Sequence, residues 1–125
     1  MKREIKRIEE LVRSMQDSPT AVGFLSLAAA LEGYRDAARD YLQDFPAEVR
    51  QAVEDVLFKV YDGLREEIIA LVWKSNEAGI IETGLACEIC TLCASIVFVL
   101  GESRIVACCD AMEVGDGSEH FAHSF

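Results

Sequence analysis

The residues whose type and spacing most suggest a chemical role are three cysteines in the pattern Cys-x2-Cys-x2-Cys. They are Cys87, Cys90 and Cys93. A loop with this spacing can wrap thiolates around an iron–sulfur cluster, and Cys108 or Cys109 would supply the fourth ligand. Here Glu-Ile and Thr-Leu fill the gaps, inside a run that is typical of a helix. On a continuous helix the three sulfurs spread over about a third of the circumference and cannot converge on one ion unaided. We therefore expect core cysteines, with no metal or cofactor; a metal or redox protein using Cys87, Cys90, Cys93 and Cys108 is the alternative.

The two histidines, His120 and His123, lie beside Asp116 and Glu119 in a segment of glycines and small polar residues. Gathering metal ligands from such a segment is entropically costly, so we interpret it as a tail. Because the chain has no other histidine, no Ser-His-Asp or Cys-His set is anchored in a predicted core. Phosphate-binding glycine motifs and the G-x-S-x-G elbow are also absent from the sequence. We expect a protein that is not an enzyme.

A second pattern is a line of carboxylates at every fourth residue. They are Glu32, Asp36, Asp40, Asp44 and Glu48, and we call them the acidic strip. Pairing with neighbouring arginines predicts an ordinary solvated helix face. The functional interpretation is a docking strip for a basic partner, because a rise of about 6 Å per four helical residues is close to the phosphate spacing of one DNA strand.

The charge of the chain is strongly acidic: the formal net charge is −10 over 125 residues, and residues 105–125 contain no Lys or Arg. This charge disfavours direct binding to nucleic acid or anionic lipid and favours basic surfaces. Residues 1–13 are too charged for a signal peptide, and the cysteine pattern suits reduced thiols, so we expect a cytoplasmic protein. Residues 80–100 have the length of a membrane span, but that alternative must carry Glu82 and Glu88.

Hydrophobic periodicity predicts helices over residues 2–16, 19–44, 47–78 and 83–100. Ser18 before Pro19 is the predicted start of the second helix. Apolar residues in this helix keep the three-four alternation of a left-handed helix pair. They are Phe24, Leu27, Leu31, Tyr34, Ala38, Tyr41 and Phe45. We expect the partner helix to lie within the chain, and the alternative is a homodimer through Phe24, Leu27, Leu31, Tyr34 and Tyr41.

The third and fourth predicted helices are joined at Gly79, which together with Ile80 is typical of a left-handed helix stop. The third helix carries an apolar stripe of Val53, Leu57, Val60, Leu64, Ile68 and Leu71, widened by Val49, Val56, Ile69 and Val72. Thr83 is the predicted cap of the fourth helix, and Gly101 its end. Residues 85–100 are apolar on nearly every side, so we expect this helix to be surrounded by the others.

These elements predict an all-α fold, a four- to five-helix bundle with a buried central fourth helix. Residues 1–114 would form the single helical domain and residues 115–125 a flexible acidic, histidine-containing tail. The alternative is an α+β fold with a C-terminal hairpin over residues 96–109, because residues 96–100 are rich in β-branched and aromatic side chains.

An acidic helical domain without a catalytic set is best interpreted as a protein-binding module. It would inhibit or regulate a basic, nucleic-acid-binding protein, without touching nucleic acid or membrane itself. The expected contact residues are the acidic strip together with Asp110 and Glu113. Two alternatives remain open: the cysteine-ligated metal or redox protein, and a self-assembling helical structural protein.

Overall fold

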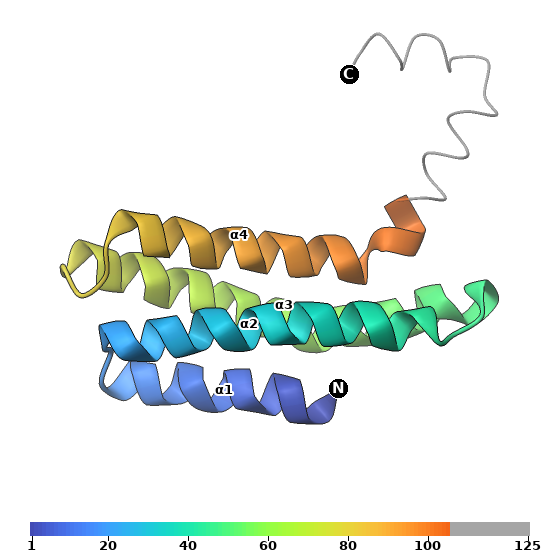
Figure 1. Ribbon diagram of the computed structural model, residues 1–125, viewed down its shortest axis with the longest axis horizontal. Coiled ribbons are helices and arrows are strands. Elements are labelled where there is room, and N and C mark those ends of the chain that lie inside the picture. Colours follow the sequence, from blue (N-terminus) through green and yellow to red (C-terminus); the bar gives the residue numbers. More distant parts are fainter. Residues whose placement is uncertain (106–125) are drawn as a thin grey trace, which may run out of the picture.

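The computed structural model describes residues 1–105, which form an all-α bundle (Figure 1). Its helices are α1 (Lys2–Asp17), α2 (Ala21–Gln43), α3 (Ala47–Glu77) and α4 (Thr83–Leu100), and a helical turn over residues 102–105 follows Gly101. Residues 1–105 contain no strand, so the all-α prediction is confirmed and the hairpin alternative is wrong for residues 96–105. The predicted domain boundary at residue 114 and the predicted tail lie outside the described residues.

The helices run up and down in chain order, with α1 and α4 on opposite sides of α2 and α3 (Figure 1). Helix α2 contacts all three other helices, most extensively α4. Its seam residues Phe24, Leu27, Leu31 and Tyr34 are at most 1% exposed. The predicted seam is therefore filled within one chain. A homodimer through it would have to open the core, since of its five residues only Tyr41 reaches the surface.

Two of the four predicted helix ends are shifted in the structure, and the end of α4 at Gly101 is confirmed. Helix α2 starts two residues after Pro19 because the Thr20 hydroxyl, rather than Ser18, accepts the backbone N–H of Gly23 at 3.0 Å. Thr83 is the first residue of α4 and does not cap it. The stop at Gly79 is confirmed: its φ is 78°, and the next N–H, of Ile80, bonds back to the Ser75 carbonyl at 2.9 Å.

Most of the predicted stripe of α3 faces the core: Leu71 is buried, and Val53 and Leu57 pack against the core. Leu64 and Ile68 are buried as expected, but Val60 is 55% exposed and Tyr61 takes its place in the core. The Tyr61 ring stacks on Tyr34, with centroids 5.9 Å apart, and its hydroxyl donates to the Cys93 carbonyl at 3.0 Å. A buried tyrosine needs such an acceptor for its hydroxyl, and the Cys93 carbonyl supplies it.

Helix α4 is not surrounded, contrary to the prediction. It packs one face on α2 and α3 and leaves the opposite face open, so that only 39% of its residues are buried. By length and composition α4 is apolar enough to cross a membrane, a property it shares with core helices of other proteins. The open face is the feature from which the candidate site is built.

Candidate functional site

The open face of α4 carries an uncharged row at heptad spacing. Its members are Gly84, Cys87, Thr91, Ala94 and Phe98, and we call them the α4 row. All five are exposed, Phe98 by 57%. The spacing of three and four residues is that of a seam which pairs with another helix, and small residues in a seam let the partner approach closely. Glu88, beside the row, is the only charged residue of α4.

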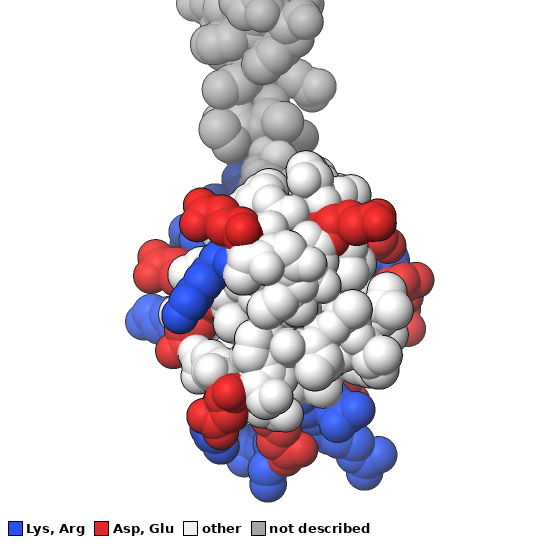
Figure 2. Space-filling model, turned by 90° about the vertical axis from the view of Figure 1, so that its left-hand side faces the viewer, with Lys and Arg blue, Asp and Glu red and all other residues white. Residues whose placement is uncertain are grey.

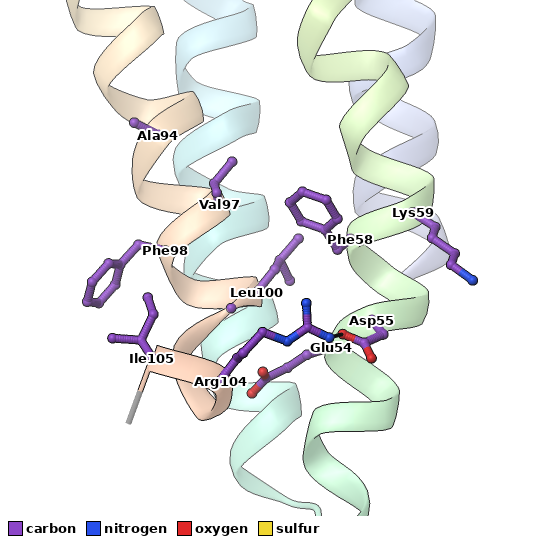
Figure 3. A pocket seen from close by; sticks show the side chains of 11 residues that line it. Glu54, Asp55, Phe58, Lys59, Ala94, Val97, Phe98, Leu100, Arg104 and Ile105 are labelled. Atoms are coloured by element: carbon purple, nitrogen blue, oxygen red, sulfur yellow. Dashed lines mark hydrogen bonds and ion pairs between the residues drawn. The ribbon is translucent and has the colours of Figure 1, made fainter. Parts of the chain in front are cut away.

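The Phe98 end of the row opens into a cavity of about 680 Å³ between α3 and α4, the α3–α4 groove. Phe58 and Val97 point toward each other from the two helices, and Phe98 lies beside Ile105 (Figure 3). An apolar cleft with a few polar groups at its edge is typical of a binding site.

The floor of the groove is closed by contacts between α3 and the turn after α4. The Glu54 carboxylate, 2% exposed, accepts the Ser103 hydroxyl at 2.6 Å and the Ser103 N–H at 3.3 Å. Next to it, Arg104 reaches across to Asp55 at 2.8 Å (Figure 3). A carboxylate at the first N–H groups of a helical turn acts as a cap supplied by another helix. These contacts hold the turn over residues 102–105 against α3.

The rim of the groove carries one positive charge without a described counterion. Asp55 and Arg104 neutralise each other, and the Glu54 carboxylate is occupied by Ser103. Lys59, which also lines the groove, forms no ion pair with any residue in 1–105. Within residues 1–105, Lys59 is therefore a cation at this rim that no acidic side chain neutralises.

The three cysteines of α4 lie on different sides of the helix. Cys87 is exposed, Cys90 is half-buried and Cys93 is in the core. Burial is the main cause that raises the pKa of both the Cys90 and the Cys93 thiol above the ordinary value. Within residues 1–105 no three His, Cys, Asp or Glu side chains are placed to hold a metal ion. Cys108, Cys109 and both histidines lie outside the described residues.

All five residues of the acidic strip are exposed. Asp36 is paired with Arg35 at 3.1 Å and with Arg39 at 3.7 Å, while no ion pair joins Glu32 to Arg35. Four-residue steps advance by about 40° around a helix, so the strip turns through roughly 120° between Glu32 and Asp44. It is a winding line and not a flat face, which weakens its likeness to a phosphate backbone. The predicted contacts Asp110 and Glu113 lie outside the described residues.

The end of the bundle that contains the α1–α2 loop and the α3–α4 loop is also apolar. Figure 2 shows uncharged atoms across its centre and charged side chains around its edge. Val22, at 72%, and Leu25, at 57%, are the most exposed large apolar residues here, and Ile80 lines a shallow hollow beside Leu25. This end lies at the opposite end of α4 from the groove, so its residues serve as controls in tests of the groove.

No family model, curated protein or solved structure matches this chain. The site therefore rests on its own geometry. Sequence reasoning missed the row and the groove, because both depend on which side of an evenly apolar helix is turned outward. The heptad order of Gly84, Cys87, Thr91, Ala94 and Phe98 was the one signal that could have found the row.

Proposed function

We propose that this protein is a recognition module that binds a basic amphipathic helix of a partner protein along the α4 row. The observation that carries the proposal is a heptad-spaced, uncharged and exposed row on a helix whose other face is already packed. Apolar residues of a partner helix would interlock with the row, and its aliphatic or aromatic anchors would reach the α3–α4 groove beside Phe98.

The negative charge beside the row and over the whole chain favours a basic partner. Glu88 is exposed and stands beside the row at a heptad position that flanks a seam. The net charge of −10 would attract a basic partner over a longer range. Proteins that bind nucleic acid carry such surfaces. We therefore propose that the chain inhibits or regulates such a nucleic-acid-binding protein, because this role uses both the α4 row and the negative charge.

The acidic strip has a lesser role in this proposal. Its exposed carboxylates would raise the association rate with a basic partner without forming the contact surface. Asp40→Asn with Asp44→Asn should therefore slow association at low salt and leave the dissociation rate nearly unchanged. A clear increase in the dissociation rate would instead make the strip part of the contact.

The test uses designed helical peptides of about three heptads, with leucine at the seam and either lysine or glutamate on the flanks. Fluorescence anisotropy should show binding of the Leu/Lys peptide and not of the Leu/Glu peptide. Phe98→Glu should weaken binding roughly tenfold or more, because a carboxylate would enter the apolar contact. Val22→Glu is the matched control, since Val22 is also open to solvent but lies at the other end of the bundle. Equal binding by both variants would refute the proposal.

A second copy of the chain is the competing occupant of the row. Light scattering over a range of concentrations distinguishes it: a dimer that Phe98→Glu converts to a monomer would replace partner recognition by self-assembly. A wild-type monomer at every concentration supports a different partner.

A further inference from the structure

We propose that Cys87 and Cys90 form a redox-active dithiol on α4, which exchanges with low-molecular-weight disulfides and closes to a disulfide between the two residues. The structure places one of these thiols at the surface and leaves the other half-buried beside it. The inference goes beyond the proposed function, and the dithiol itself does not depend on that function.

The first argument is the spacing of the two residues on one helix. They are three residues apart within α4, so their Cα atoms lie about 5 Å apart and their side chains about 60° apart around the axis. Disulfides bridge Cα atoms at about 4.4–6.8 Å. The Cβ atoms of such a pair are roughly 1–2 Å farther apart than in a relaxed disulfide. The bond can therefore form with a local adjustment of the helix, and it stays easy to reduce.

The second argument is the turn of α4 that joins the two thiols. The Thr91 hydroxyl donates to the Cys87 carbonyl at 2.8 Å, so this carbonyl serves both the helix and a side chain. Such bonds to the preceding turn slightly destabilise a helix and often bend it. The turn that must adjust when the disulfide forms is thus one in which the helical bonding is already shared.

The surroundings of the thiols set the order in which they react. Cys87 is exposed and meets a reagent directly, whereas Cys90 is half-buried. The pKa of the Cys90 thiol is raised, mainly by burial and further by Cys87, while a hydrogen bond from the Trp73 side chain of α3 acts in the opposite direction. Cys93 is 1% exposed in the core. Cys87 is therefore the entry point, Cys90 the resolving thiol and Cys93 a bystander.

The exchange oxidises the two protein thiols and reduces one small disulfide, such as oxidised glutathione. The Cys87 thiolate attacks one sulfur of the small disulfide, so a mixed disulfide forms and one small thiolate leaves. The Cys90 thiolate then attacks the Cys87 sulfur and displaces the second small thiolate. The two protons of the protein thiols pass through solvent to the two small thiolates, and the two electrons are those that reduce the small disulfide.

The experiment incubates the folded full-length protein with oxidised and reduced glutathione, stops the exchange with acid and maps the products by mass spectrometry. A protease that cleaves after glutamate cuts at Glu88, between the two thiols. It releases Cys87 in residues 83–88 and Cys90 in residues 89–102. We expect the two peptides to remain linked, with the mass of two hydrogen atoms lost, and to separate after treatment with an excess of reduced glutathione.

Three variants assign the roles of the thiols. Cys90→Ser should stop the exchange at the mixed disulfide, so that glutathione accumulates on Cys87. Cys87→Ser should lower the incorporation of glutathione into α4 roughly tenfold or more, because the exposed thiol is lost. Cys93→Ala is the matched control and should leave the link unchanged. A link that survives Cys90→Ser, or wild-type protein that keeps glutathione on Cys87 without closing, would overturn the proposal.

Trp73 is the only tryptophan of the chain and provides a second readout in the intact protein. Because its side chain contacts the Cys90 thiol, closure of the disulfide should quench its fluorescence with the same time course as the link forms. Cys90→Ser should abolish this change, and Cys93→Ala should preserve it. A link that forms without any change in fluorescence would arise from unfolded molecules and would contradict a site on the folded helix.

The dithiol lies in the α4 row, because Cys87 is one of its members. One consequence rests on the proposed function: the disulfide turns Cys87 toward Cys90, so oxidation should weaken binding of the Leu/Lys peptide and reduction should restore it. A link that forms in a protein that binds the peptide in neither state would keep the dithiol and reject helix recognition. Peptide binding by a protein that never forms the link would reject the dithiol alone.

Discussion

The buried carboxylate of Glu54 in α3 accepts a 2.6 Å hydrogen bond from the hydroxyl of Ser103, which lies 49 residues later in the chain. The same carboxylate accepts the Ser103 backbone N–H. It therefore joins the first third of α3 to the turn after α4. A charged group at a core position is tolerated when hydrogen bonds satisfy it, as they do here.

We expect Glu54→Ala to lower the free energy of unfolding by about 1–3 kcal/mol, because it leaves the Ser103 donors unsatisfied next to a new cavity. Ser103→Ala should cost about 1 kcal/mol. A double-mutant cycle by urea denaturation should give a coupling energy above about 0.5 kcal/mol, since the residues are in direct contact. Glu67→Ala, at an exposed site in the middle of the same helix, should have almost no effect. Strict additivity of the Glu54 and Ser103 changes would show that the bond is energetically unimportant.

Replacement of glycine by alanine should have opposite effects on stability at two positions. Gly79 has a φ of 78°, so Gly79→Ala should cost about 1–2 kcal/mol through backbone strain. Gly63 lies in the middle of α3 with open space where a Cβ would be, so Gly63→Ala should stabilise the protein by up to about 1 kcal/mol. Thermal and urea unfolding of the two variants measure both signs. A stabilising Gly79→Ala would mean that the loop between α3 and α4 differs from the one described.

The stacked tyrosines predict a loss of stability at high pH. Burial, assisted by the charge of Glu4, raises the pKa of Tyr34 to about 12, and burial raises the pKa of Tyr61 further. An unfolded tyrosine titrates near pH 10. Between these values the unfolded chain binds fewer protons than the native one, so stability falls as the pH rises.

The expected slope above about pH 10 approaches 1.4 kcal/mol per pH unit for each buried tyrosine. Below that pH the contribution of the two tyrosines is fully present and constant. Urea unfolding at a series of pH values measures the slope, and Tyr34→Phe should reduce it by about one proton. A slope that Tyr34→Phe leaves unchanged would show that Tyr34 ionises as easily in the native state as in the unfolded one.

The parts of the fold that could be predicted are those in which a local sequence pattern is compatible with a single structure. The alternation of Phe24, Leu27, Leu31 and Tyr34 defines a single narrow stripe, and this stripe is in the core. The Gly79 stop depends only on the backbone freedom of one residue. Such signals lie within a few turns of the chain and need no knowledge of the neighbouring helices.

The candidate site could not be predicted because it depends on contacts distant in sequence. In α3, Tyr61 and not Val60 enters the core, where it contacts Tyr34 and the Cys93 carbonyl, both distant in sequence. Helix α4 is apolar all round, so its pattern does not indicate which face is open. Glu54 lies three residues before Leu57 and seven before Tyr61. Its spacing in the sequence alone therefore indicates the core-facing side of α3. Its partner Ser103 lies 49 residues away, and no local pattern in the sequence links the two residues.

The most direct test of recognition through α4 is an NMR titration of isotope-labelled protein with the Leu/Lys peptide, monitored through the backbone amides. We predict that the largest shift changes fall on Cys87, Thr91, Ala94 and Phe98, with smaller changes along α3 at Phe58 and Lys59. Shift changes confined to Asp36, Asp40 and Asp44 would instead place the contact on the acidic strip, and would contradict a binding surface formed by the open face of α4.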